Sequence, residues 1–154
     1  MKINIYTDGA AKGNPGPGGY GVVLMAGKLY KELSAGYRLT TNNRMELLAV
    51  IVGLEALKKR HQEVTVYSDS KYVVDAVEKG WVFNWEKKSF KSKKNQDLWK
   101  RFLISFRVHQ VRFKWIKGHA GHPQNEKCDQ LAVAASESTQ LSIDKEYESA
   151  LKMD

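Results

Sequence analysis

Four acidic side chains stand where the sequence predicts that a strand or a helix begins or ends. Asp8 and Asp69 each close a short apolar segment, Glu46 opens a long apolar one, and Asp129 lies beside apolar positions later in the chain. Carboxylates that a fold gathers together repel one another, so such a group usually holds a hard divalent cation. In a chain that is otherwise strongly basic, this combination indicates an enzyme that cleaves nucleic acid.

Each acid also has an ordinary structural explanation. An aspartate before glycine is common in turns, and Asp69 or Ser70 can simply cap the helix that follows. Glu46 is harder to explain in this way, because residues 45–57 are apolar around most of a helix and a carboxylate near the core needs a partner. A cation or the neighbouring Arg44 could supply that partner. The four acids therefore indicate a site only as a set.

The composition describes a basic chain of single-domain size. It has 154 residues and a formal net charge of +8. Residues 137–154 contain five acids and two lysines, a charge of −3, which leaves +11 for residues 1–136. We therefore divide the chain into a domain, residues 1–136, and an acidic, loosely ordered tail, residues 137–154. The charge of the domain favours a polyanionic partner.

Other features bear on where the protein works. The single cysteine, Cys128, excludes an internal disulfide bond and fits a reducing compartment. Residues 1–5 are too short and too polar for a signal peptide, and no stretch approaches the roughly 18 apolar residues of a membrane span. We expect a soluble, cytoplasmic monomer that does not associate with membranes.

Alternating strands and helices must position the four acids. Residues with period-two or β-branched character predict strands at 2–8, 20–26, 29–39, 63–67 and 110–116, with a hairpin turn at 26–28. Apolar positions at helical spacing predict helices at 43–60, 70–79, 81–88, 95–108 and 124–136. The first helix ends in cations that suit its dipole, Lys58, Lys59 and Arg60. This order predicts an α/β fold with a mixed sheet, whose first three strands are antiparallel.

The predicted sheet gives two of the acids a common location. In open α/β sheets, ligands gather at the carboxyl ends of the strands. Asp8 and Asp69 occupy that position on two strands that can lie side by side. We therefore expect them to face the same site.

Several blocks of the sequence resemble type 1 ribonuclease H, the bacterial form. They include TDGA (7–10), GNPG (13–16), TTNNRMEL (40–47), SDS (68–70), KGHAGHP (117–123) and NEKCD (125–129). The blocks occur in order and cover about residues 3–135, which makes the resemblance very specific. It implies a ribonuclease H-like α/β fold, a five-stranded mixed sheet with helices on both sides. It also implies an endonuclease that hydrolyses the RNA strand of RNA–DNA hybrids and leaves 3′-hydroxyl and 5′-phosphate ends.

The resemblance also implies roles for single residues. His119 would assist proton transfer or product release, and four acids would be metal ligands: Asp8, Glu46, Asp69 and Asp129. The implied cofactor is Mg²⁺, with two ions in the active site and Mn²⁺ as a substitute. Two such ions about 4 Å apart can activate a water and neutralise the charge on the phosphate and the leaving oxygen. A zinc site of His119, His122 and Cys128 is the alternative, but its spacing fits no common pattern.

A basic and aromatic segment is the expected substrate surface. Residues 79–101 contain eight cations, only two acids and five interleaved aromatic residues, which favours phosphate binding and stacking. In the family, this region grips the DNA strand, while asparagines contact RNA 2′-hydroxyls and a threonine–asparagine pocket holds a DNA phosphate. The substrate-binding residues that the resemblance implies are Asn14, Thr41, Asn42, Asn43, Lys71, Trp81, Trp85, Lys87, Lys88 and Asn95.

Four features depart from the family's pattern. Leu39 replaces an arginine of the phosphate pocket, although Arg38 is next to it. Lys71 stands where glutamine commonly follows the Asp-Ser pair, and Glu86 stands where a cation is common. The loop at residues 89–94 is shorter than in the best-known members. We expect a correspondingly lower affinity for the hybrid.

Two other functions are possible on the same fold. A non-catalytic nucleic-acid-binding module would be expected to have lost an acid, and all four are present. A junction resolvase or an integrase-like nuclease would lack the basic aromatic segment and the KGHAGHP block. Cleavage of RNA–DNA hybrids is therefore the preferred prediction.

Overall fold

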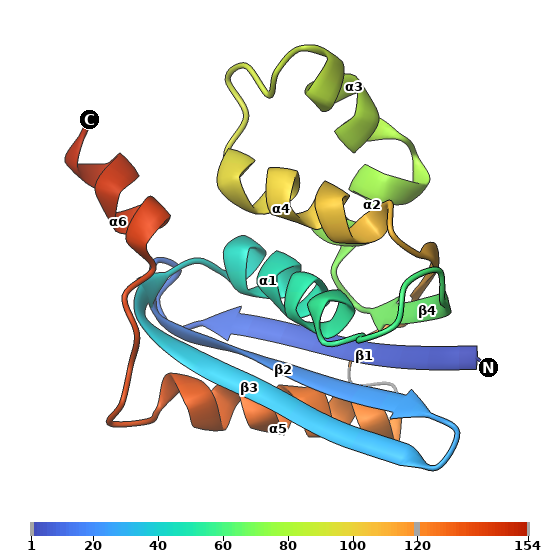
Figure 1. Cartoon of the computed structure of the whole chain (residues 1–154). Helices are drawn as coiled ribbons and strands as arrows, with labels where there is room; N and C mark the ends of the chain where they lie inside the picture. Colours follow the sequence, from blue (N-terminus) through green and yellow to red (C-terminus); the bar gives the residue numbers. More distant parts are fainter. Residues whose placement is uncertain (1, 119–120, 154) are drawn as a thin grey trace.

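A five-stranded mixed sheet in the order β3-β2-β1-β4-β5 forms the centre of the molecule (Figure 1). The computed structural model describes residues 2–118 and 121–153. The strands are β1 (Lys2–Ala11), β2 (Gly16–Ala26), β3 (Leu29–Thr40), β4 (Glu63–Ser68) and β5 (Gln110–Trp115). The first three pair antiparallel, whereas β4 lies parallel to both β1 and β5. The predicted α/β class, the five-stranded mixed sheet and the antiparallel pairing of its first three strands are confirmed.

Helices cover both faces of this sheet. They are α1 (Asn42–Glu55), α2 (Lys71–Glu78), α3 (Trp81–Lys87), α4 (Gln96–Phe106), α5 (Pro123–Ser136) and α6 (Lys145–Lys152). On one face, α1 packs on the sheet with α4 beyond it, and α5 covers the other face (Figure 1). This enclosure explains why α1 is apolar around most of its circumference. Among the described residues, no helix is both long and apolar enough to cross a membrane.

The predicted helices are found with changes at their ends. The first ends at Glu55, so the three cations at residues 58–60 follow it in the connection to β4 and do not face its dipole. All three are exposed, and without an apolar side chain to bury, packing does not stabilise another helical turn.

The acidic tail is more ordered than its composition predicted. Ser142 bridges to Tyr37 of β3, and α6 follows. Asp144, only 8% exposed, accepts hydrogen bonds from the Arg44 guanidinium at 2.7 and 2.9 Å. In the structure the tail is therefore held against the domain by backbone contacts at Ser142 and by the buried carboxylate of Asp144. Independent folding of residues 1–136 stays a prediction.

Two glycines allow the elements that carry acids to approach one another. A Cβ atom at Gly9 of β1 would lie 2.5 Å from the backbone nitrogen of Glu46, so glycine permits β1 to reach the start of α1. A Cβ atom at Gly21 of β2 would collide with the backbone carbonyl of Cys128 on α5. These close contacts bring Glu46 and Asp129 toward the end of β1 from opposite faces of the sheet.

Candidate active site

Three of the predicted acids meet at the carboxyl end of the parallel strands. Tyr6 of β1 pairs with Tyr67 of β4, so Asp8 and Asp69 follow at matching positions two residues later. Glu46 reaches them from the start of α1. One carboxylate oxygen from each of these three acids lies within 4.8 Å of the others. The expectation that the two aspartates face one site is therefore met.

Burial makes the charges of this group costly. Burial is the largest cause that raises the pKa of Asp8 from 3.8 to about 7; the charges of Asp69 and Asp129 contribute to this rise, and a hydrogen bond with Glu46 opposes it. The pKa of Glu46 is also raised, first by burial and then by the charges of Asp8 and Asp69. Glu46 Oε1 is buried and finds no hydrogen-bond partner among the described residues. A divalent cation would supply the missing partner, so these residues fit a metal ion.

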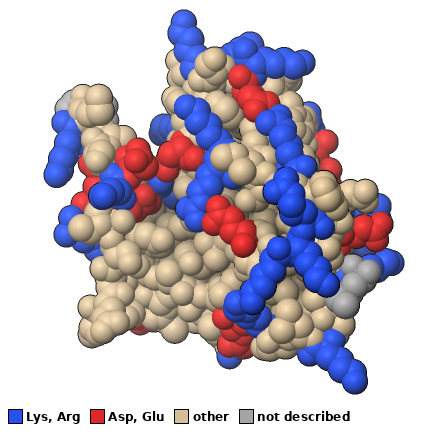
Figure 2. Space-filling model, in the orientation of Figure 1, with Lys and Arg blue, Asp and Glu red and all other residues tan. Residues whose placement is uncertain are grey.

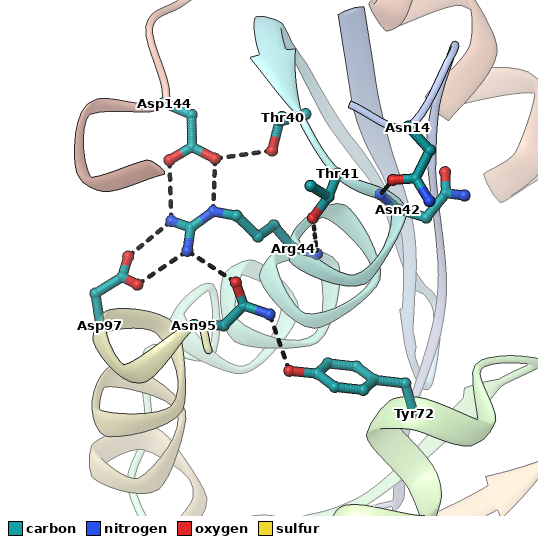
Figure 3. Close-up of polar contacts among 9 residues, drawn as sticks. All are labelled: Asn14, Thr40, Thr41, Asn42, Arg44, Tyr72, Asn95, Asp97 and Asp144. Atoms are coloured by element: carbon teal, nitrogen blue, oxygen red, sulfur yellow. Dashed lines mark hydrogen bonds and ion pairs between the residues drawn. The ribbon is translucent and has the colours of Figure 1, made fainter. Parts of the chain in front are cut away.

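Arg44 does not pair with Glu46, because its guanidinium is committed elsewhere. It is 3% exposed and donates to Asp97 of α4 at 2.9 and 2.7 Å, and to Asp144 at 2.7 and 2.9 Å (Figure 3). Of the two partners that the sequence left open for Glu46, this geometry favours a cation. Sequence reasoning missed the network itself, since the two acids lie 53 and 100 positions from Arg44.

The two remaining catalytic candidates differ in what the structure describes. Asp129 of α5 is half-buried and lies outside the tight group of three, but near enough for its charge to raise the pKa of Asp8. His119 lies outside the described residues.

The zinc alternative loses support, because the Cys128 thiol is buried and donates to the Tyr6 carbonyl oxygen at 3.1 Å. Burial raises the pKa of this thiol to about 12, which disfavours a thiolate ligand.

The caps of α1 and α2 are made by Thr41 and Ser70, not by Asn42, Asn43 or Asp69. Thr41 Oγ1 accepts a hydrogen bond from the Arg44 N–H at 3.2 Å, so neither asparagine that follows Thr41 is needed as a cap. Ser70 Oγ accepts from the Val73 N–H at 3.3 Å at the start of α2. Asp69 is therefore not the cap of α2, and its ordinary structural explanation is removed.

Two predicted substrate contacts, Asn14 and Asn42, lie together beside the start of α1 (Figure 3). The Asn42 backbone N–H donates to Asn14 Oδ1 at 2.9 Å, and Asn42 Oδ1 accepts from the Ala11 N–H at 2.5 Å. Both side-chain oxygens thus accept hydrogen bonds from the backbone, and the amide NH₂ group of each side chain carries its donors. Asn43 is exposed beside them.

A cleft of about 810 Å³ is lined by the two residues expected to form a phosphate pocket, Thr41 and Asn95. Its lining includes Asn14, Thr41, Asn43 and Asn95, three lysines, and Glu146 and Tyr147 of α6. Asn95 Oδ1 accepts from Arg44 at 3.3 Å, and its amide donates to the Tyr72 hydroxyl at 2.9 Å (Figure 3). Arg38, the candidate replacement for the pocket arginine, pairs with Glu148 of α6 at 2.8 Å. The wall formed by α6 was not foreseen from the sequence, because the tail was expected to be loose.

The other substrate candidates lie on α2, α3 and the loop that leads to α4. Lys and Arg side chains predominate over the region of α3 and α4 in Figure 2. Trp81 and Trp85 each face a lysine ammonium, at 5.2 and 5.0 Å from the ring centre. Lys87 and Lys88 are exposed at the end of α3, and Lys71 begins α2 next to the acids. The lysines and tryptophans that the sequence predicted as a substrate surface therefore lie together on α3 and the segments next to it.

Comparisons with known sequences point to one family. The family model for RNase H matches residues 1–137. The ribonuclease H of Desulforamulus reducens is 57% identical, with 93% of this chain and 92% of the relative covered. The ribonuclease H of Klebsiella pneumoniae is 50% identical, with 96% of this chain and 98% of the relative covered.

Solved structures show the same fold. LC9-RNase H1, a type 1 RNase H, superimposes with a TM-score of 0.80 at 33% identity, covering 92% of this chain and 74% of its own. LC11-RNase H1, solved in complex with an RNA/DNA hybrid, gives a TM-score of 0.66 at 29% identity, covering 86% of this chain and 95% of its own.

Proposed function

This chain belongs to the ribonuclease H family, and from that premise we propose that it hydrolyses the RNA strand of RNA–DNA hybrids by two-metal-ion catalysis. As a family member it is an endoribonuclease. One observation carries the metal part of the proposal: Asp8, Glu46 and Asp69 converge, and Glu46 brings a buried carboxylate oxygen that has no hydrogen-bond partner within residues 2–118 and 121–153. The hybrid bound to LC11-RNase H1 supports the choice of substrate.

The metal ligands in this proposal are four carboxylates, those of Asp8, Glu46, Asp69 and Asp129. Carboxylate oxygens suit Mg²⁺, and Mn²⁺ would substitute. When bound, two Mg²⁺ ions supply an activated water and neutralise the charge on the phosphate and the leaving oxygen. Since burial raises the pKa of Asp8 to about 7, the metal-free group holds protons near neutral pH, and ion binding releases them.

Further residues would complete the reaction and hold the substrate. His119 would give a proton to the departing 3′ oxygen, which leaves 3′-hydroxyl and 5′-phosphate ends. The amide donors of Asn14, Asn42 and Asn43 would contact the RNA strand, including its 2′-hydroxyls. The DNA strand would be held by the cleft at Thr41 and Asn95 and by the basic surface with Trp81, Trp85, Lys87 and Lys88. We place the enzyme in the cytoplasm as a monomer.

Substrate choice separates this function from its alternatives. Labelled RNA–DNA hybrid, duplex DNA and duplex RNA are each incubated with the protein and Mg²⁺, and the products are resolved on a gel. The proposal expects cutting confined to the RNA strand of the hybrid, with 5′-phosphate ends. Cutting of duplex DNA would instead support a resolvase-like nuclease. Binding of the hybrid without cleavage would support a non-catalytic module.

A further inference from the structure

One aromatic side chain outside the predicted site contacts two residues that belong to it. Trp115 ends β5 and is 42% exposed. Its indole N–H donates to the backbone carbonyl of Asp69 at 3.1 Å. Its ring lies against the Lys71 ammonium, which is 4.1 Å from the ring centre. Trp115 thus contacts the residues on both sides of Ser70, at the connection between β4 and α2.

The contact with Asp69 concerns a metal-ligand candidate on a very short connection. Residues 69–70 are the whole link from β4 to α2, so no regular backbone hydrogen bonding of a strand or helix fixes Asp69. The indole donor on its carbonyl supplies one such constraint from the neighbouring strand. Partners that orient a ligand in this way commonly affect metal affinity.

The contact with Lys71 holds a cation whose charge is not neutralised. Among the described residues, no carboxylate oxygen lies within 4.0 Å of its ammonium. Lys71 is also the first residue of α2, where the helix dipole disfavours a positive charge. Its charge therefore does not stabilise the helix, whereas the indole face attracts the ammonium and restricts its position.

We propose that Trp115 is a positioning residue with two effects, one through Asp69 on metal binding and one through Lys71 on nucleic-acid binding. This rests on the proposed function. Because Lys71 lies two residues from Asp69, the phosphate within its reach belongs to the strand that is bound at the acids. Lys71 therefore binds a phosphate of the cleaved strand, as a point charge at a position where the family commonly has an amide.

Two substitutions separate the two effects. Lys71→Gln removes the ammonium and leaves the indole bond to Asp69 in place. We expect the KM for hybrid to rise about fivefold and the slope of log KM against log salt to fall by about 1, with kcat and Mg²⁺ affinity unchanged. Lys28→Gln, in the exposed turn between β2 and β3, is the matched control and should change neither quantity.

Trp115→Phe keeps an aromatic face for Lys71 but removes the indole donor. We expect Mg²⁺ affinity, measured by calorimetry without substrate, to fall about tenfold, with a lower kcat and an unchanged salt slope. Trp115→Leu removes both contacts and should show both effects. Circular dichroism and thermal unfolding establish that each variant is folded.

The outcomes also distinguish this inference from the proposed function. A wild-type protein that leaves the hybrid uncut refutes the function, whereas the calorimetric comparison still tests the contact with Asp69. With an active wild type, an unchanged KM and salt slope in Lys71→Gln overturns the phosphate contact. Equal Mg²⁺ affinity in folded Trp115→Phe and wild type overturns the positioning role.

Discussion

Asp8 and Glu46 are held where their charges are unfavourable. Burial raises the pKa of both carboxyls, and that of Asp8 reaches about 7. The folded metal-free protein therefore binds protons that the unfolded chain has already released. An arrangement that lowers stability in this way is expected where function and not folding selects the residue.

The raised pKa values predict how stability depends on pH. A carboxyl whose folded pKa is raised contributes stability that is complete below its unfolded pKa and is lost as pH rises through the folded value. For Asp8, the free energy of unfolding should therefore fall as pH rises from about 4 to about 7. Urea unfolding in EDTA across this range measures the change. Mg²⁺ should restore stability mainly at the upper end, and a metal-free profile that rises with pH would contradict the assignment.

Replacing Glu46 should separate stability from activity. Glu46→Gln replaces a buried carboxyl, which at neutral pH must take up a proton or stay charged next to Asp8 and Asp69, with a neutral amide, so the metal-free protein should gain on the order of 1–2 kcal/mol while cleavage is lost. Urea unfolding and hybrid cleavage are measured on the same preparation. Glu63→Gln, exposed at the start of β4, is the matched control and should leave both unchanged. An active Glu46→Gln would contradict the role as ligand.

At the scale of helices and strands, the pattern of apolar residues in the sequence predicted the pairing of two strands but not the end of α1 or the attachment of α6. Alternation predicted β1 and β-branched character predicted β4, and the parallel pairing of the two strands brought Asp8 and Asp69 together as expected. The end of α1 was misplaced, because helix propensity and suitable cations continued beyond the last residue that could be buried. The anchor of α6 was missed for a different reason: Asp144 is a single polar residue, and its partner is distant in sequence.

The ion pair at Asp144 should be a main attachment of the tail. Arg44 is almost fully buried, so Asp144→Asn leaves part of its charge without a partner and should cost about 2–4 kcal/mol in urea unfolding. Glu137→Gln serves as the matched control, because its pair with Lys12 is half exposed and should contribute less than about 0.5 kcal/mol. Equal effects of the two substitutions would show that the tail is not held in this way.

At the scale of the whole molecule, opposite charges meet at the cleft. The body carries the excess of Lys and Arg, while the negative tail returns across its surface and places Glu146 in the cleft that is assigned to the DNA strand. The sequence predicted both charges but not their meeting, because it gave no path for the tail. A phosphate that enters this cleft would meet a carboxylate as well as lysines.

Removing that carboxylate should strengthen binding of the hybrid. Glu146→Gln takes away a like charge, so the KM should fall about two- to threefold at low salt, and the difference should shrink as salt screens it. Steady-state cleavage at two salt concentrations gives the comparison, with Glu63→Gln again as the control. A KM that rises would show that Glu146 assists binding.

The most direct test of the whole account is single-turnover cleavage of the RNA strand by the wild type and Asp8→Asn at saturating Mg²⁺. Asp8 is one of the three acids whose carboxylate oxygens converge, and its substitution removes a ligand from the proposed ions. Since charge stabilisation by bound metal is worth several kcal/mol, the rate should fall by at least about 10³-fold in a protein that stays folded. An Asp8→Asn variant that cleaves the hybrid within about tenfold of the wild-type rate would contradict the metal-dependent mechanism.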